Sequence, residues 1–354
     1  MIEMQYNYPL LPGLPAQWRE RLRTAVDALG EDNFDELRPS YRNDLTALSN
    51  AGARWMGTPA ERTFLTASGH HGSLLALMAG GLAGRGIAVD ATAYTGGLAQ
   101  AHALGCPVTG CAMDDEGMLP ESLREQCAAG RIAAIYVTPT VHNPLGFVVS
   151  LARREALVEV AREFDLLMIE DDAYGYMEPD APPTLSKLAP ERTFYVRGLS
   201  KSYAPAARTG FLVVPERFVP GLLSAIMNSA GGSSLVHHRA AVSLIEDGTL
   251  DRVIAEKNAE GARRNAAARS LLKNRCWPGA RAAWHLWVNL PAGTTPQWFE
   301  KRMVEREVLI SGGNWFAASK NAPHGFRIAL GGEVDSARTL EGVARVAEEL
   351  DRVS

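Results

Sequence analysis

The sequence lacks the features that mark secreted, membrane-spanning and metal-binding proteins. Its 354 residues hold four cysteines and no Cys-x-x-Cys pair, so we expect reduced thiols and a cytoplasmic protein. The N-terminus, MIEMQYNYPL, has no charged segment followed by an apolar run, unlike a signal peptide. The longest apolar stretch, residues 73–83, is too short to cross a bilayer, so no membrane partner is expected. His70 and His71, like His237 and His238, are neighbours whose side chains would diverge in a strand, and we expect no metal site.

An excess of charge of either sign is also absent. The net charge is −4, charged residues make up 21% of the chain, and neither half is strongly basic, which argues against a nucleic-acid partner. With 46% hydrophobic residues, the chain is long enough for a sizeable core and for roughly two domains.

Short apolar runs alternate with helical patterns over the first two thirds of the chain. Residues 151–164 give the clearest helix, because Leu157, Val160, Ala161 and Phe164 repeat at helical spacing behind Ser150 as a possible N-cap. The alternation predicts a mostly parallel sheet that is covered by helices on both faces. The expected strands are residues 63–66, 87–89, 107–111, 132–138, 166–169, 193–196 and 210–214.

The pattern changes after Pro215 and predicts a second, smaller α+β unit. Long helical segments fill residues 218–272, three short strands follow at 283–289, 308–311 and 326–330, and an amphipathic helix occupies 334–353. A further helix at 15–29, with Gly30 as its C-cap, could pack on either unit. We expect a large domain at residues 31–240 and a discontinuous small domain at 1–30 and 241–354.

Lys201 stands out because lysine is scarce, with six residues against thirty arginines. It lies in Gly-Leu-Ser-Lys-Ser-Tyr just after the expected strand 193–196, and ligands of α/β sheets bind at the carboxyl ends of strands. A lysine in a partly desolvated site offers a neutral amine that can form a Schiff base. The alternative is an ordinary surface lysine in a loop.

Polar residues follow two other expected strands. Asp171 and Tyr174 come at the end of strand 166–169, where a carboxylate could pair with a protonated ring nitrogen and a tyrosine could reach an oxygen of the same ring. A solvated acidic turn is the alternative. Asn143 follows strand 132–138 in Asn-Pro-Leu-Gly, a sequence that is also typical of a plain turn.

Two arginines and one loop suggest anion binding. The segment 68–72, Ser-Gly-His-His-Gly, leads from a strand into a helix, whose free N–H groups suit a phosphate. Arg208 would add a charge to the same phosphate, unless it forms a surface ion pair. Arg327 alternates with apolar residues on a short strand, so it is either a carboxylate clamp or part of the wet face of the sheet.

Taken in order, these motifs resemble the fold-type I enzymes that use pyridoxal 5'-phosphate (PLP), in particular the class I/II aminotransferases. The resemblance extends from about Asn7 to the C-terminus. It is greatest to the kynurenine/α-aminoadipate aminotransferases and to the aminotransferase-like domain of some bacterial transcription regulators. It implies a three-layer α/β/α large domain with a mostly parallel sheet and a smaller α+β domain. The motifs fall at Gly69, Tyr94, Asn143, Asp171, Tyr174, Ser200, Lys201, Arg208, Gly210 and Arg327.

The resemblance also implies a role for each residue. Lys201 would hold PLP as a Schiff base and move a proton, while Asp171 would keep the pyridine nitrogen protonated. Asn143 and Tyr174 would bind the ring hydroxyl oxygen, and Tyr94 would stack on the ring. Arg327 would bind the substrate carboxylate beside Asn143. The phosphate would contact the backbone of Gly69, His70 and His71, and the side chains of Ser200 and Arg208.

The sequence departs from the family pattern near the phosphate. Gly198 replaces a Ser or Thr three residues before the lysine, His70 and His71 replace small polar residues, and His238 replaces a frequent Gln. Tyr41 matches the tyrosine that reaches the phosphate of a neighbouring subunit, so a homodimer with shared sites is expected. The N-terminal segment, which usually lines the substrate entrance, is short.

The expected function is therefore transfer of an amino group between an α-amino acid and a 2-keto acid through Lys201. Elimination, cyclisation, decarboxylation or oxidation on the same cofactor stays open, because the reaction depends on which substrate bond lies perpendicular to the ring. A PLP-binding effector domain is a further alternative, although such regulators carry a DNA-binding domain ahead of the part that here starts within ten residues of Met1. Trp315 and Phe316 favour an apolar or aromatic substrate if they line the pocket, and simple core packing if they do not.

Overall fold

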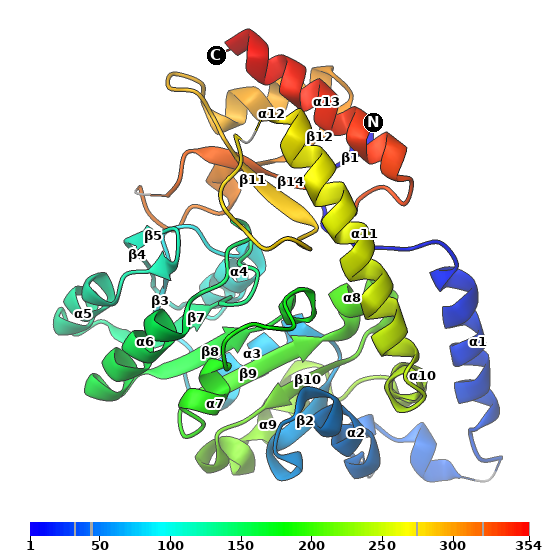
Figure 1. The fold of residues 1–354 in the computed structure, drawn as a ribbon. Coiled ribbons are helices and arrows are strands. Elements are labelled where there is room, and N and C mark those ends of the chain that lie inside the picture. The colour runs from blue at the N-terminus through cyan, green and yellow to red at the C-terminus, as the bar shows by residue number, and fades with distance from the viewer. Residues whose placement is uncertain (32, 43–44, 274, 321, 354) are drawn as a thin grey trace.

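The computed structural model describes residues 1–31, 33–42, 45–273, 275–320 and 322–353 (Figure 1). The chain forms a large sheet with helices on both faces and a smaller sheet beside it. This architecture confirms the predicted three-layer α/β/α unit with a smaller α+β unit.

The large sheet has seven strands in the order β2-β10-β9-β8-β7-β3-β4. All neighbouring pairs that exclude β10 are parallel, while β10 runs antiparallel to both β2 and β9. Strands β3 (Gly86–Asp90) and β8 (Leu167–Asp171) are buried along their whole length, as expected for apolar runs covered on two faces. The seven predicted strands are confirmed with shifts of one or two residues at their ends. They are β2 (Thr63–Thr66), β3 (Gly86–Asp90), β4 (Val108–Cys111), β7 (Ile132–Val137), β8 (Leu167–Asp171), β9 (Thr193–Gly198) and β10 (Gly210–Val213).

Successive side chains of each strand point to opposite faces of the large sheet, so the hydrophobic core is divided between these two faces. On β8, Leu167 and Ile169 pack on one side against α3 (Gly69–Ala79), α4 (Thr95–Ala103) and α9 (Val219–Ser229). Met168 packs on the other side, where α5 (Pro120–Ala128), α6 (Leu151–Glu163) and α7 (Leu185–Leu188) lie. Two more helices, α2 (Thr46–Met56) and α10 (Leu235–Glu246), cover β2, β9 and β10 on this second face. Asp171 therefore shares the α3 face, and Glu170 the opposite one.

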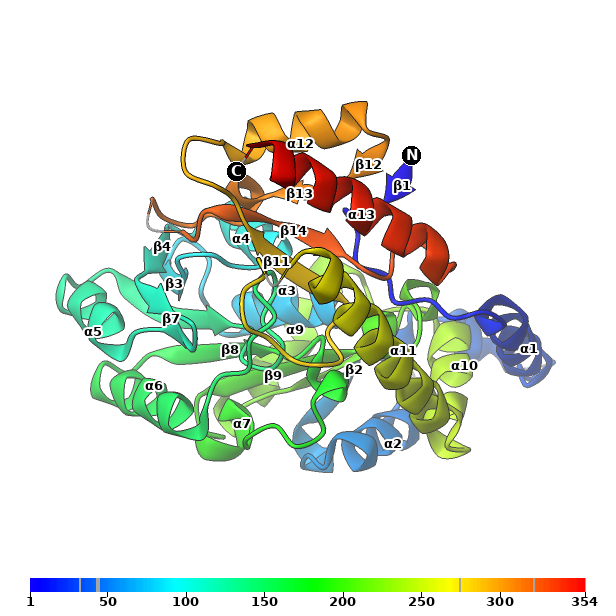
Figure 2. The same cartoon turned by 45° about the horizontal axis from the view of Figure 1, so that its top comes forward.

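The longest helix, α11 (Thr249–Leu271), runs from the large sheet to the smaller one (Figure 2). Its buried polar side chains include Lys257, Arg264 and Asn265. No helix in the described part of the chain is long and apolar enough to cross a membrane.

The smaller sheet pairs β11 (His285–Asn289), β14 (Gly325–Ala329) and β13 (Ser311–Gly312) in antiparallel order. Beside it, β1 (Ile2–Glu3) pairs in parallel with β12 (Val308–Leu309) in a separate two-stranded sheet, so the N-terminus joins a strand from the last quarter of the chain. Helices α12 (Pro296–Glu305) and α13 (Ser336–Val353) complete this unit.

The predicted N-terminal helix forms as α1 (Leu14–Asp27) and packs along α10. The prediction that Gly30 caps it was wrong. The helix ends at Ala28, whose N–H bonds back to Thr24 O, and Ala28 has φ −85°, so no left-handed residue is needed there. The domain boundaries at residues 30 and 240 stay a prediction.

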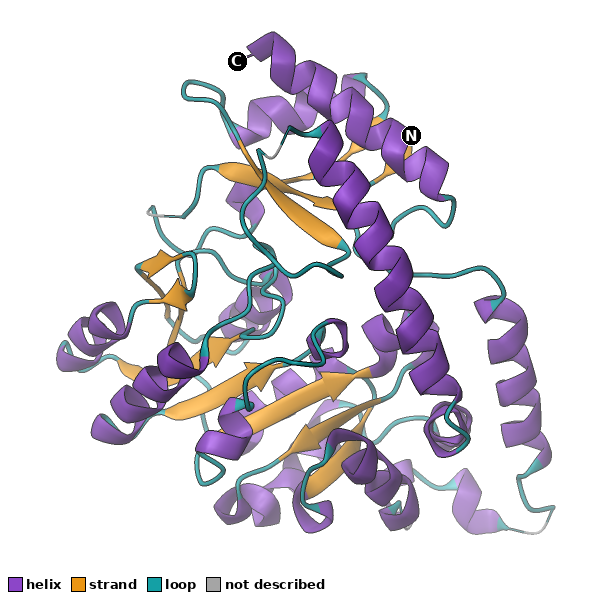
Figure 3. Cartoon of the chain, viewed as in Figure 1, coloured by secondary structure: helices purple, strands orange, loops and turns teal. Residues whose placement is uncertain are grey.

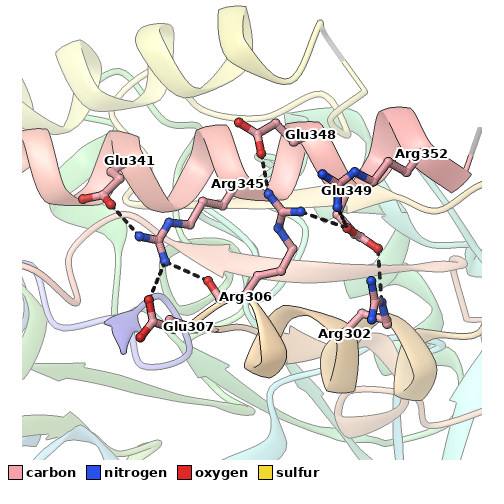
Figure 4. A network of polar contacts seen from close by, with 8 residues as sticks. All are labelled: Arg302, Arg306, Glu307, Glu341, Arg345, Glu348, Glu349 and Arg352. Carbon is pink, nitrogen blue, oxygen red and sulfur yellow. Dashed lines mark hydrogen bonds and ion pairs between the residues drawn. The ribbon is translucent and has the colours of Figure 1, made fainter.

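Ion pairs join α12 to α13 (Figure 4). Glu349 on α13 is 2% exposed and pairs with Arg302, Arg306 and Arg352. Arg345 pairs with Glu341 and with Glu307 beyond the end of α12. Exposed pairs of this kind contribute little to stability, but a buried carboxylate such as Glu349 requires its partners.

Candidate active site

A pocket of about 230 Å³ lies at the carboxyl ends of β8 and β9, in the region where loops fill the space between the two sheets (Figure 3). Ligands of α/β sheets bind at the carboxyl ends of the strands. The pocket is lined by most of the predicted site residues: Gly69, His70, Tyr94, Asn143, Asp171, Tyr174, Ser200, Lys201 and Arg208.

Asp171 and Asp172 diverge at the end of β8. The Asp171 carboxylate lines the pocket and accepts a hydrogen bond of 2.6 Å from the Tyr136 hydroxyl. Burial raises the pKa of Asp171 to about 6, and the Tyr136 hydrogen bond opposes that rise. Asp172 points to the other side of the sheet, where it pairs with Arg197 at 3.8 Å and accepts from the Tyr195 hydroxyl. Only Asp171 can therefore meet a ligand in this pocket.

Lys201 lies on the one-turn helix α8 (Leu199–Ser202), which follows β9 directly. Its Nζ donates to the Asn7 carbonyl and lies 4.6 Å from the centre of the Tyr8 ring. Burial, and then the nearby Arg327 charge, lower the pKa of Lys201 to about 7, while Asp171 opposes the shift. The amine is therefore neutral in a large fraction of molecules near neutral pH, as a nucleophilic lysine requires.

The start of α3 forms the base of an anion cradle. Ser68 caps the helix by accepting from the His71 N–H at 3.1 Å, while Gly69 and His70 line the pocket. Burial and then Arg208 lower the pKa of His70. Arg208 faces the same pocket and forms no ion pair within the described parts of the chain. A helix N-terminus beside an available guanidinium suits a phosphate or carboxylate.

His71 does not line the pocket, and the expected contact of its backbone N–H with a phosphate stays a prediction. Its N–H is engaged by the Ser68 cap, and its ring lies between the Ala67 N–H, at 3.1 Å, and the Ser229 hydroxyl, at 3.0 Å. Successive side chains on a helix diverge by about 100°, so only one of two adjacent histidines can face the ligand.

Close packing explains why glycine occupies position 198. A Cβ on Gly198 would lie 2.8 Å from the Gly69 nitrogen, and a Cβ on Gly210 would lie equally close to it. The start of α3 therefore rests directly on the ends of β9 and β10. A Ser or Thr at position 198, as in the family pattern, has no room here.

Arg327 reaches the pocket region from β14 of the smaller sheet. It is 8% exposed, so the alternative of a wet sheet face was wrong. Its guanidinium donates to the Asn143 side-chain oxygen at 2.8 Å and to the Gln5 carbonyl at 2.5 Å, and it lies 4.9 Å from the Phe316 ring centre. The Phe316 ring thus packs against the guanidinium. Trp315 is instead 56% exposed and bonds to Glu300, away from the pocket lining.

The N-terminal segment supplies two site residues that the sequence did not reveal. Besides accepting from Lys201, Asn7 donates from its amide to the Tyr174 hydroxyl at 3.2 Å and contacts the His285 ring nitrogen at 3.2 Å. Tyr8 lines the pocket. Both residues reach the site because β1 pairs with β12, a contact across 306 positions that leaves no local spacing signal.

Tyr41 lies outside the pocket of its own chain. It borders a separate, larger hollow of about 620 Å³ between α2, β2 and α9, whose walls include Leu45, Phe64 and Leu223.

The packing at Gly198 gives a stability prediction. We expect Gly198→Ala to lower the free energy of unfolding by about 1–3 kcal/mol, because the new methyl group must displace the α3 backbone. The matched control is Gly221→Ala on α9, where a Cβ would meet nothing within 4 Å and which should be neutral or slightly stabilising. Chemical denaturation of both variants measures this, and equal effects of the two would contradict the packing argument.

Comparison with known proteins agrees with the geometry. A profile of the family described as aminotransferase class I and II matches residues 7–346. The mitochondrial kynurenine/alpha-aminoadipate aminotransferase of Mus musculus is 27% identical over 263 residues, which cover 68% of this chain and 62% of that protein. The helix-turn-helix transcriptional regulator YdfD of Bacillus subtilis (strain 168) is 28% identical over 256 residues, which cover 70% of this chain and 53% of the regulator. The match thus spans between half and two thirds of these relatives' length.

Solved structures share the fold. An archaeal alanine:glyoxylate aminotransferase aligns with a TM-score of 0.88 and 21% identity, covering 99% of this chain and 91% of that one. The Pyrococcus horikoshii kynurenine aminotransferase, in complex with PMP, aligns with a TM-score of 0.86 and 22% identity over the same shares. Together with the profile match over almost the whole sequence, these findings show that the chain belongs to the aminotransferase class I and II family.

Proposed function

We propose that this protein is a cytoplasmic, PLP-dependent aminotransferase that moves an amino group between an α-amino acid and a 2-keto acid. The observation that carries the proposal is one pocket with three distinct parts. It holds the largely neutral amine of Lys201, the buried carboxylate of Asp171, and an anion cradle at the start of α3 beside Arg208. Family membership supports the same conclusion.

The residues present fit PLP by their chemistry. Asp171 would hold the ring nitrogen, Lys201 would hold the aldehyde carbon, and Asn143 and Tyr174 would hold the ring hydroxyl. The start of α3, with Ser200 and Arg208, would hold the phosphate, because Gly198 and Gly210 leave the backbone of Gly69 close to the sheet. When bound, the cofactor supplies an electron sink for the substrate α-carbon.

The protein's own groups supply binding and proton transfer. The Lys201 amine, with a pKa near 7, can take a proton from the α-carbon and return it. Arg327 offers a planar pair of N–H donors that suits an α-carboxylate, and its guanidinium packs against the Phe316 ring. One of these donors now contacts the Gln5 carbonyl, so a substrate carboxylate would take the place of that backbone contact.

A PLP-binding effector domain is the second candidate, because helix-turn-helix regulators such as YdfD match about 70% of this chain. Such a domain would bind the same cofactor and amino acid without turnover. Elimination, cyclisation, decarboxylation or oxidation would retain the cofactor but release different products. Product analysis with an amino acid and a 2-keto acid together separates these alternatives from transamination.

The first test concerns Lys201. We expect the protein to take up PLP, turn yellow, and retain the cofactor covalently on the peptide that contains Lys201 after borohydride treatment. Lys201→Ala should still bind the cofactor through its phosphate but should neither be labelled nor transaminate. Mass spectrometry of the digested protein measures this. A label on Lys187, the nearest lysine before it in the sequence, or no label at all would contradict the assignment.

The divergence of the two aspartates gives a second prediction. Asp171→Asn should lower turnover by about 100-fold or more, because a neutral amide no longer stabilises a charged ring nitrogen. Asp172→Asn should affect turnover far less, since that side chain faces Tyr195 and Arg197 on the other side of the sheet. Steady-state kinetics of both variants, with cofactor content measured, decides between them. The reverse order of effects would show that the wrong carboxylate has been assigned.

We also propose a homodimer with shared sites. Tyr41 and Leu223 border an open hollow outside the pocket, and Leu223 and Met227, one turn apart on α9, are about half exposed. Exposed apolar side chains beside a hollow are typical of interfaces. The wild-type protein should sediment as a dimer, and Leu223→Glu with Met227→Glu should give monomers that bind PLP more weakly. A wild-type monomer that keeps full activity on dilution would refute the shared site.

A further inference from the structure

Lys257 is a second buried lysine, on α11, that the proposed chemistry does not use. Its side chain is fully buried, and among the described residues no carboxylate pairs with it. A buried ammonium without a counter-ion is costly unless hydrogen bonds satisfy its donors. Those bonds are present, because Nζ donates to the Lys201 carbonyl at 2.9 Å and to the Tyr203 carbonyl.

These carbonyls belong to the end of α8, the one-turn helix that carries Lys201. The last carbonyls of any helix have no partner inside it, and α8 ends only one residue after Lys201. A lysine is well suited to cap such a helix end, since it supplies several donors and a positive charge. Lys257 therefore holds the main chain of the residue whose amine faces the pocket.

The same helix also holds the strand that carries Arg327. Two turns after Lys257, the buried Arg264 donates to the carbonyls of Leu330, Glu333 and Val334 at 2.8, 2.7 and 2.6 Å. Leu330 follows β14 directly, three residues after Arg327. One helix thus bonds the backbone of Lys201 at one point and the end of the Arg327 strand at another. Figure 1 shows α11 passing α8 and running on toward β14.

We propose that Lys257 is a positioning residue that fixes the backbone of Lys201 and, through α11, sets the Lys201 amine relative to Arg327. The proposal rests on the proposed role of Lys201. It gives Lys257 no contact with substrate or cofactor.

The electrostatics add a measurable consequence. Burial, and then the charge of Lys201, lower the pKa of Lys257 to about 7, so each amine disfavours the charge of the other. The other charged groups that act on Lys201 are Arg327 and Asp171. Because like charges oppose each other, removing the Lys257 charge should let Lys201 accept a proton at higher pH.

The experiment compares Lys257→Met, which removes donors and charge at similar length, with Lys257→Arg, which retains both. Lys273→Met is the matched control, because Lys273 is exposed and pairs with Asp351 at the surface. In the cofactor-free protein, trace labelling with acetic anhydride at several pH values titrates Lys201 directly. After PLP addition, the growth of the visible absorption band gives the rate of covalent attachment.

We expect Lys257→Met to attach PLP about tenfold more slowly than the wild type, since two hydrogen bonds to the Lys201 segment are lost. Its Lys201 labelling curve should move to higher pH. Lys257→Arg should recover most of both properties, and Lys273→Met should match the wild type. If Lys257→Met lowers only the melting temperature, with wild-type labelling and attachment, the proposal is overturned.

Two further variants keep the outcome decisive. If Lys257→Met does not fold, Lys257→Gln, which keeps donors without charge, should still move the Lys201 labelling curve, and an unmoved curve overturns the proposal. Lys201→Ala distinguishes a failure of the proposed function from a failure of the proposed role of Lys257. Covalent attachment of PLP that persists in Lys201→Ala would refute the proposed function itself. If attachment is lost in Lys201→Ala while Lys257→Met behaves like the wild type, only the role of Lys257 is refuted.

Discussion

The withdrawal of the Lys201 amine from water is the interaction on which the site depends. An exposed lysine is almost fully protonated at neutral pH, but burial lowers the pKa of this one to about 7. The amine lies at the end of β9, under the Tyr8 ring and against the Asn7 carbonyl. Since a single strand end cannot enclose an amine, segments from both sheets and from the N-terminus have to meet there.

The path of the chain brings these segments together around the Lys201 amine. The large sheet supplies Asp171, Asn143 and Lys201 at the carboxyl ends of its strands, where all parallel strands must end at the same edge. The N-terminal residues are held beside the smaller sheet by the pairing of β1 with β12, and Tyr8 lines the pocket before α1 begins. Arg327 enters from β14 and bonds both Asn143 and Gln5, so one guanidinium links three distant segments. A substrate carboxylate bound to Arg327 would therefore affect the contacts of all three segments.

Much of the fold and the pocket could be predicted, because their signals are local. Continuous apolar runs marked the buried strands, and polar residues just after them, such as Asp171, Asn143 and Lys201, marked the pocket. The sequence could not show which of the adjacent residues His70 and His71 faces the pocket. Which of the two faces a ligand depends on how the helix is rotated against the sheet.

Other features depend on contacts between distant segments and have no sequence signal. Asn7 and Tyr8 reach the site through a strand pairing with residues about 300 positions away. Gly198 departs from the family pattern because the backbone of Gly69 lies where its side chain would be. The capping of α8 by Lys257 likewise requires α11 to pass beside it, which periodicity along α11 does not reveal.

The most direct measurement is a half-reaction with the PLP-loaded protein. An α-amino acid alone, added without any keto acid, should convert the bound cofactor to its amine form, with a loss of the visible band and release of one equivalent of 2-keto acid. Addition of a 2-keto acid should then restore the band. A band that stays unchanged with every amino acid, or a product other than the matching 2-keto acid, would contradict the assignment of this site to transamination.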